Sequence, residues 1–127
     1  MIEITKQSLI EGLEAIVAEY GADYVYPAKE RRGRSEDREC FYVHEGQPDC
    51  IVGKFLHSVG VPLERLQEAD DSADASAMTL LTELAWANVI NADLGVRQAL
   101  SVAQRWQDWG YTWGDALQRA KELLGQQ

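Results

Sequence analysis

One cysteine of the sequence lies where its thiol could be activated for nucleophilic chemistry. Cys50 follows a predicted turn over 45–48 and stands at the predicted start of a helix over 50–59. The positive end of a helix dipole stabilises a thiolate, and a nearby histidine could then serve as the base. His44 could approach Cys50 if the turn folds back, whereas His57 is seven residues further along, about 10.5 Å at the helical rise. A hydrolase or transferase that uses Cys50 with His44 is therefore one hypothesis, with a small, semi-buried structural cysteine as the default.

Cysteine and histidine side chains could also hold structural zinc, because tetrahedral zinc sites take mixed sets of the two. Four such residues are available, Cys40, His44, Cys50 and His57, but neither cysteine belongs to a Cys-x-x-Cys pair. The predicted helix separates Cys50 from His57, and extended chain separates Cys40 from His44 by about 13 Å. We therefore predict no metal site. The sequence also lacks a glycine-rich phosphate-binding loop, so no cofactor is expected.

Carboxylates that could work as a paired acid and base occur in one cluster, formed by Asp70, Asp71 and Asp74. The cluster lies in a polar break between predicted helices, where we expect solvated side chains and no catalysis. It belongs to an acidic stretch from Glu64 to Asp93, which holds seven acidic residues and one basic residue. We expect this side of the protein to attract basic partners.

Aromatic residues crowd the predicted bend between the last two helices. Trp106 and Trp109 are three residues apart and share a helix face, and Tyr111 and Trp113 follow directly after them. Packed inward, these rings would clamp the two helices together. Left exposed, they would anchor a partner protein, because such residues dominate the energetics of interfaces. We take Trp109, Tyr111 and Trp113 as the candidate binding residues of the bend.

A charged stretch at about 28–39 is predicted to be a mobile loop, because it carries a glycine and alternates basic with acidic residues. Its five basic and four acidic side chains leave a net charge of +1. A nucleic-acid binder is therefore a second alternative function, with Arg31, Arg32 and Arg34 as candidate contacts. The net charge of −9 for the whole chain opposes binding to phosphate backbones and to anionic membranes, so neither is the partner that we expect.

Hydrophobic residues recur at helical spacing along most of the chain, which predicts about five helices. The predicted segments lie between Thr5 and Gly21, over 50–59, over 78–90, over 94–109 and after Thr112, with a further short helix from Pro62 to Ala69. The predicted N-terminal caps are Thr5, Asp49, Ser76, Asp93 and Thr112. Two β-prone runs, 24–26 and 40–44, are expected to pair as a small antiparallel ribbon between the first and second helix. The predicted fold class is therefore α+β and mainly helical.

The length of 127 residues, 1–127, fits one globular domain, and 46% hydrophobic with 26% charged residues is typical of such a domain. No apolar stretch approaches the roughly 20 residues that span a bilayer. Two cysteines are too few for a disulfide scaffold. Residues 1–5 show no secretory leader, so we expect a cytoplasmic protein.

Two segments of the sequence, 40–62 and 104–117, resemble uncharacterised small proteins of actinobacterial phages and prophages. In the first segment the resemblance is carried by Cys40, Tyr42, Val43, Gly46, Pro48, Cys50, Ile51, Val52, Gly53, Leu56, Gly60, Val61 and Pro62. In the second it is carried by Gln104, Gln107, Asp108, Gly110, Thr112, Trp113, Gly114, Ala116 and Leu117. The two segments cover 37 of the 127 residues, and the resemblance implies an accessory protein of a phage or host genome, with no activity attached.

Together these observations predict a small acidic protein-interaction module. We expect a protein partner, contacted through the acidic side or through exposed aromatic residues at the last bend. A phage-encoded accessory protein or modulator of a host protein, located in the host cytoplasm, fits both the resemblance and the lack of a catalytic constellation in the sequence.

Overall fold

The computed structural model describes residues 1–27, 29–31, 34–39, 41–72 and 75–125, with the backbone alone in 29–31 and 34–39. Six helices lie in these residues: α1 (Lys6–Tyr20), α2 (Ile51–Ser58), α3 (Leu63–Asp70), α4 (Ala77–Trp86), α5 (Leu94–Asp108) and α6 (Trp113–Leu123). Short strands pair in three places within the same residues: β1 (Ile2–Glu3) with β6 (Ile90–Asn91), β2 (Lys29–Arg31) with β3 (Arg34–Glu39), and β4 (Val43–His44) with β5 (Gln47–Pro48). The predicted class, mainly helical α+β, is confirmed.

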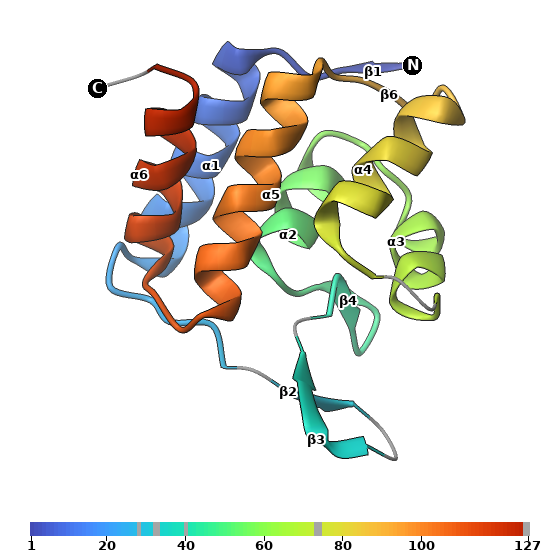
Figure 1. Cartoon of the computed structure of the whole chain (residues 1–127), viewed down its shortest axis with the longest axis vertical. Coiled ribbons are helices and arrows are strands. Elements are labelled where there is room, and N and C mark those ends of the chain that lie inside the picture. Colours follow the sequence, from blue (N-terminus) through green and yellow to red (C-terminus); the bar gives the residue numbers. More distant parts are fainter. Residues whose placement is uncertain (28, 32–33, 40, 73–74, 126–127) are drawn as a thin grey trace.

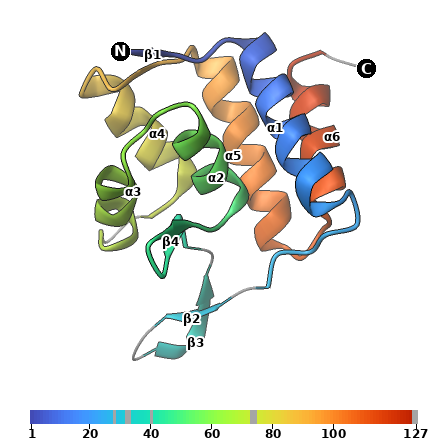
Figure 2. The same cartoon turned by 180° about the vertical axis from the view of Figure 1, so that it is seen from behind.

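Four helices pack around the core so that each contacts the next and the last contacts the first (Figure 1, Figure 2). α1 packs against α6, α6 against α5, α5 against α2, and α2 against α1. α4 lies on the other side of α5, and α3 packs beside β4. The β1–β6 pair lies at one end of the helices, and the β2–β3 hairpin extends from the other end. α5 is therefore the central helix, since it contacts α2, α4 and α6.

The core consists of apolar side chains from all six helices. Its fully buried members come from distant parts of the sequence and include Leu9, Leu13, Tyr42, Phe55, Leu66, Leu81, Leu100 and Trp113. Removal of this apolar surface from water is the main favourable term in folding. No helix in the described part of the chain is both long and apolar enough to cross a membrane.

Most helices begin at the residue that was expected to cap them. Thr5 Oγ1 accepts from Ser8 N at 3.0 Å, and Ser8 Oγ accepts from Thr5 N at 2.9 Å, which forms a reciprocal cap at the start of α1. The side chains of Ser76, Asp93 and Thr112 each accept the backbone N–H three residues on. Gly21 ends α1 at a φ of 99°, in the left-handed region that favours glycine.

The predicted cap of α2 is wrong by one residue. Cys50, and not Asp49, is the N-cap, and its Sγ accepts from Gly53 N at 3.5 Å. The Asp49 carboxylate instead accepts a hydrogen bond from the hydroxyl of Tyr26, which is buried. Burial, followed by the hydrogen bond to Asp49, raises the pKa of Tyr26 far above its ordinary value. Tyr26, which is distant in sequence, thus binds the Asp49 carboxylate that the local pattern predicted to cap α2.

The helix predicted over 78–90 ends early. α4 stops at Trp86, and Asn88 takes a φ of 60°, which interrupts the helical backbone. The residues that follow form β6, which pairs in parallel with β1. Ile2 N donates to Val89 O at 2.9 Å. The backbone after α4 therefore finds hydrogen-bond partners in β1 that a longer helix would have provided within itself.

An antiparallel ribbon lies between α1 and α2, as predicted, but other residues form it. Its strands, β2 and β3, lie inside the stretch 28–39 that the composition assigns to a loop. Their register places Lys29 opposite Glu39, Glu30 opposite Arg38 and Arg31 opposite Arg34. The two β-prone runs pair elsewhere, one with the start of α6 and one within β4–β5. The mobility of this stretch stays a prediction.

Candidate interaction surface at the α5–α6 bend

The chain turns sharply between α5 and α6, and aromatic side chains gather around the turn. Trp109 follows the last residue of α5, and Gly110 takes a φ of 90°, which lets the chain reverse. Tyr111 comes next, and Thr112 caps α6. Trp109 is 63% exposed and Tyr111 is 44% exposed, so both of these predicted contact residues face solvent.

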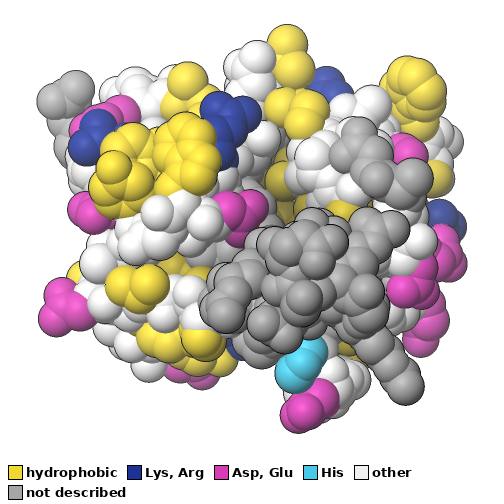
Figure 3. Space-filling view, turned by 60° about the horizontal axis from the view of Figure 1, so that its bottom comes forward, with side chains coloured by type: hydrophobic (Ala, Val, Ile, Leu, Met, Phe, Trp, Pro, Cys, Tyr) yellow, Lys and Arg dark blue, Asp and Glu magenta, His cyan; other side chains and the backbone are white. Residues whose placement is uncertain are grey.

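The exposed rings belong to a cluster of contacting side chains that we name the bend surface: Trp106, Trp109, Tyr111 and Arg119. The ring centroid of half-buried Trp106 lies 6.2 Å from that of Trp109 and 4.3 Å from that of Tyr111. The Arg119 guanidinium lies 4.7 Å from the Trp106 centroid, which is a cation–π contact. Figure 3 shows hydrophobic side chains gathered beside basic ones where the lower end of the molecule in Figure 1 comes forward.

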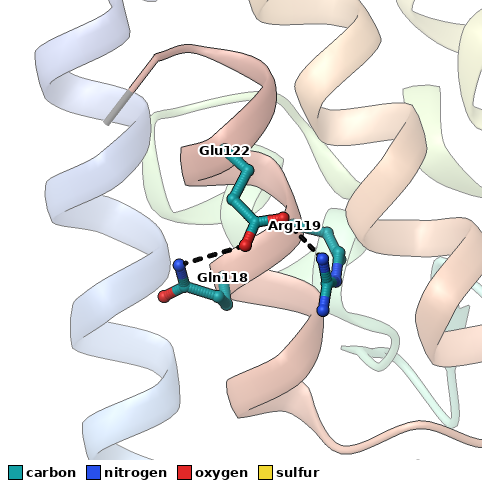
Figure 4. Close-up of polar contacts among 3 residues, drawn as sticks. All are labelled: Gln118, Arg119 and Glu122. Carbon is teal, nitrogen blue, oxygen red and sulfur yellow. Dashed lines mark hydrogen bonds and ion pairs between the residues drawn. The ribbon is translucent and has the colours of Figure 1, made fainter. Parts of the chain in front are cut away.

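Polar contacts on α6 hold the Arg119 side chain in place (Figure 4). Its Nη1 donates to Glu122 Oε1 at 2.5 Å, and Gln118 Nε2 donates to Glu122 Oε2 at 3.4 Å. The two charged side chains are 42% and 44% exposed, so their ion pair contributes little to stability. Its effect is positional, because it keeps the guanidinium on the side of α6 that faces α5 and Trp106.

Trp113 is not part of this surface, which corrects its assignment as a binding residue. The side chain is fully buried, and its ring packs edge-on against Tyr20 and Tyr24, with centroids 5.1 Å and 4.6 Å away. The backbone holds it there, since Trp113 N donates to Tyr24 O at 2.8 Å and Gly114 N donates to Ala22 O at 3.0 Å. The start of α6 is thus tied to the chain that follows α1, and Trp113 belongs to the core.

Cys50 is enclosed by the protein. Its side chain is fully buried, and Gln104 Nε2 donates to its Sγ at 3.3 Å. His44 lies in the β4–β5 hairpin opposite Gln47, with its ring centroid 6.0 Å from that of Phe41. Within the described residues no hydrogen bond joins His44 to Cys50. The geometry therefore supports a structural role for this thiol.

Two buried glutamines of α5, which the sequence analysis missed, complete the start of α2. Gln107 Oε1 accepts from Ile51 N at 2.8 Å, and Gln104 Oε1 accepts from Val52 N at 3.3 Å. With the Cys50 cap, the first three amides of α2 all have acceptors. The pattern that could have revealed them is the spacing of three residues, which places both polar side chains on the buried face of α5.

The burial of Cys50 makes a prediction about its reactivity. In a Cys40→Ser variant, iodoacetamide should label Cys50 at least about 100-fold more slowly than free cysteine at neutral pH, because local opening must first expose the sulfur. Mass spectrometry of the native protein and of the protein in denaturant measures the labelling. Rapid labelling of the native protein would instead favour the hypothesis of a cysteine nucleophile.

Asp70 is not the solvated acid that the sequence analysis expected. It is 6% exposed, its Oδ1 accepts from Tyr42 N and its Oδ2 accepts from Val43 N, both at 3.0 Å. The carboxylate therefore holds the chain before α2 against the end of α3. Asp71 is exposed as expected, and Asp74 lies outside the described residues.

The other predicted contacts and ligands fall largely on the undescribed part of the chain. Arg32 and Cys40 lie outside the described residues, and for Arg31 and Arg34 only the backbone is described, where the two are paired across the hairpin. The nucleic-acid hypothesis therefore stays a prediction. Among the described residues, no group of three or more histidine, cysteine, aspartate and glutamate side chains could hold a metal ion.

A hollow of about 400 Å³ between α1, α2 and β5 is a further feature that the sequence did not suggest. Lys54 reaches across it, where its Nζ donates to Pro48 O at 2.9 Å and lies 4.7 Å from the centroid of the Tyr20 ring. The ammonium group thus has partners within the protein, and we assign no ligand to this hollow.

The bend surface is therefore the feature of the described residues that most resembles an interaction site, because two of its aromatic rings are exposed and both contact a third. Comparison of the chain with protein-family models, with curated proteins and with solved structures gives no match.

Proposed function

We propose that the protein is a small acidic interaction module that binds a partner protein through the bend surface. The observation that carries the proposal is the exposure of Trp109 at 63% and Tyr111 at 44%, next to Trp106 and Arg119. Tryptophan, tyrosine and arginine are the residue types most enriched among those that dominate binding energy. A site built from three such types favours a protein partner.

The energetics of the two exposed rings support the same proposal. Their apolar area stays in water in the folded chain, so folding gains little from them. When a partner covers that area, the free energy of binding becomes more favourable by about 25 cal/mol for each Å² removed from water. The contacts of Trp109 and Tyr111 with the half-buried Trp106 reduce the entropy lost when a partner docks, because fewer side chains remain to be ordered.

The proposed biological setting is that of a phage-encoded accessory protein that acts on a host protein in the cytoplasm. It rests on the resemblance of 40–62 and 104–117 to small proteins of actinobacterial phages and prophages. Several residues that carry this resemblance, among them Gln104, Thr112 and Trp113, cap or pack helices here. The resemblance therefore bears on the fold, and the choice of partner depends on exposed residues such as Trp109.

The test compares proteins captured from an actinobacterial lysate by the immobilised wild-type chain and by a Trp109→Ala, Tyr111→Ala double variant. A partner of the bend surface should be reduced at least about tenfold by the double variant, as expected for residues at the centre of an interface. Leu94→Ala is the matched control, because Leu94 is 54% exposed at the opposite end of α5. Far-UV circular dichroism checks that all variants are folded. Capture that the double variant leaves unchanged would contradict the proposal.

A further inference from the structure

A second exposed tryptophan lies far from the bend surface. Trp86, the last residue of α4, is 83% exposed, more than any other large hydrophobic side chain of the described residues. The end of α4 lies near the β1–β6 pair, whereas the α5–α6 bend lies at the opposite end of the molecule (Figure 1). Trp86 is therefore not part of the bend surface.

Two hollows accompany this tryptophan along α4. One of about 280 Å³ is lined by Met78, Thr82, Glu83 and Trp86. The other, of about 220 Å³, lies between α3 and α4 and has Glu68, Leu80 and again Glu83 in its lining. Because Glu83 borders both hollows, they form one continuous surface, which we name the α4 surface. Pockets for small molecules usually enclose roughly 300–1,000 Å³, so hollows of this size suit single side chains of a macromolecular partner.

Acidic residues outnumber basic ones around the α4 surface. Glu64, Glu68 and Glu83 are exposed, and Arg65 is the one basic residue in the lining of the two hollows. Within the described part of the chain, no ion pair involves Glu68 or Glu83. These carboxylates are therefore available to positive charges of a partner.

Two features of α4 itself favour a cation at the same place. The last turn of α4 contains no basic residue, so the negative end of its dipole has no compensating side chain on the helix. The indole ring of Trp86, exposed at that end, is the best aromatic acceptor for a cation–π contact with lysine or arginine. The C-terminal end of α4, the Trp86 ring and the Glu83 carboxylate thus all favour a positive charge at this place.

The spacing along α4 indicates the shape of the partner. Met78, Thr82 and Trp86 recur every four residues and line one hollow, so they form a stripe about 12 Å long at the helical rise. A second helix laid along this stripe would present apolar side chains at the same period and place its charged side chains on either side.

We propose that the α4 surface is a second docking site, and that its partner is a protein segment forming an amphipathic helix rich in lysine and arginine. Apolar side chains of the segment fill the hollow beside Met78, one cation stacks on Trp86, and others lie against Glu83 and Glu68. The negative charges disfavour nucleic acid and anionic membranes as occupants. The site is separate from the bend surface, so the two proposals stand or fall independently.

The test measures binding of designed helical peptides to the full chain by fluorescence anisotropy of a label on the peptide. The panel contains basic amphipathic helices of several apolar spacings, each with a scrambled peptide of the same composition and a version with glutamate for lysine and arginine. At least one basic amphipathic peptide should bind more tightly than both of its counterparts, and its affinity should fall as salt is raised. If no basic amphipathic peptide binds more tightly than both of its counterparts, the proposal is wrong.

Variants then locate the binding site of that peptide. Trp86→Ala should weaken binding at least about tenfold, and Glu83→Lys about threefold or more, with a smaller dependence on salt. Glu11→Lys changes the net charge equally on the exposed face of α1 and should have little effect, as should Leu123→Ala, since Leu123 is 49% exposed on α6. Equal losses in Glu83→Lys and Glu11→Lys, or full affinity in Trp86→Ala, overturn the proposal.

Discussion

Replacing Trp113 with alanine is expected to lower the free energy of unfolding by about 3–5 kcal/mol, the usual cost of deleting a large buried aromatic side chain. Trp113 is fully buried and packs against Tyr20 and Tyr24, so the substitution leaves a cavity where α6 meets α1. The same change removes support from the start of α6, whose amides bond to the chain after α1. Denaturant unfolding followed by far-UV circular dichroism measures the loss.

Two further variants keep this prediction testable if the alanine variant does not fold. Trp113→Phe retains an aromatic ring and should lose less stability than Trp113→Ala. Trp109→Ala removes a tryptophan that is 63% exposed, and it should change the free energy of unfolding by at most about 0.5 kcal/mol. Similar losses at positions 113 and 109 would contradict the division between a core tryptophan and a surface tryptophan.

Replacing Asp70 with alanine should cost about 3 kcal/mol of unfolding free energy, because it removes a buried acceptor from two backbone amides. The Asp70 carboxylate is bonded to Tyr42 N and Val43 N, both at 3.0 Å, in a buried setting. Asp70→Asn keeps one acceptor oxygen but turns an N–H group toward the second amide, so its loss should be intermediate. Denaturant unfolding gives the free energies, and hydrogen exchange at the amides of Tyr42 and Val43 reports the local effect.

The next residue in the sequence provides the matched control for Asp70. Asp71 is exposed, and its Oδ1 accepts from Gln67 Nε2 at 3.4 Å. Asp71→Ala should therefore stay within about 0.5 kcal/mol of the wild type. If Asp70→Ala and Asp71→Ala were equally stable, the two carboxylates would be solvated alike, and the buried contact of Asp70 with the chain before α2 would be wrong.

Local features of the fold could be predicted from the sequence because they depend on residues a few positions apart. Thr5, Ser76, Asp93 and Thr112 cap their helices through a backbone amide three residues on, and this contact forms wherever the helix forms. The position of the aromatic turn was predictable for the same reason, but the exposure of its rings was not. The chain reverses direction at Gly110, between α5 and α6, and Trp109 and Tyr111 lie on either side of this glycine.

Features that depend on distant partners could not be predicted in this way. Asp49 is of a residue type that often caps helices, but its carboxylate accepts a hydrogen bond from the Tyr26 hydroxyl, and Cys50 is the N-cap. The spacing of Gln104 and Gln107 continues the buried stripe of α5, but it does not indicate that their side chains accept hydrogen bonds from the start of α2. Asp70 has the sequence context of a solvated acid, and its burial depends on the chain near Tyr42.

The same limit explains the mixed outcome at the aromatic residues. Four rings within a short stretch indicate an unusual concentration of apolar surface, but their number does not divide them between core and solvent. That division depends on α1, which covers Trp113 through Tyr20 and leaves Trp109 uncovered. Trp86 was missed because a single tryptophan at the end of an apolar helix has no local pattern that distinguishes exposure from burial.

The packing of the first helix on the last has a consequence for the kinetics of folding. α1 contacts α6 and β1 pairs with β6, so these contacts close loops that span most of the chain. Loop closure of this kind costs entropy before any contact is gained, and it slows folding relative to bundles of neighbouring helices. We therefore expect a single cooperative transition whose rate is set by the docking of α1, long after the individual helices have begun to form.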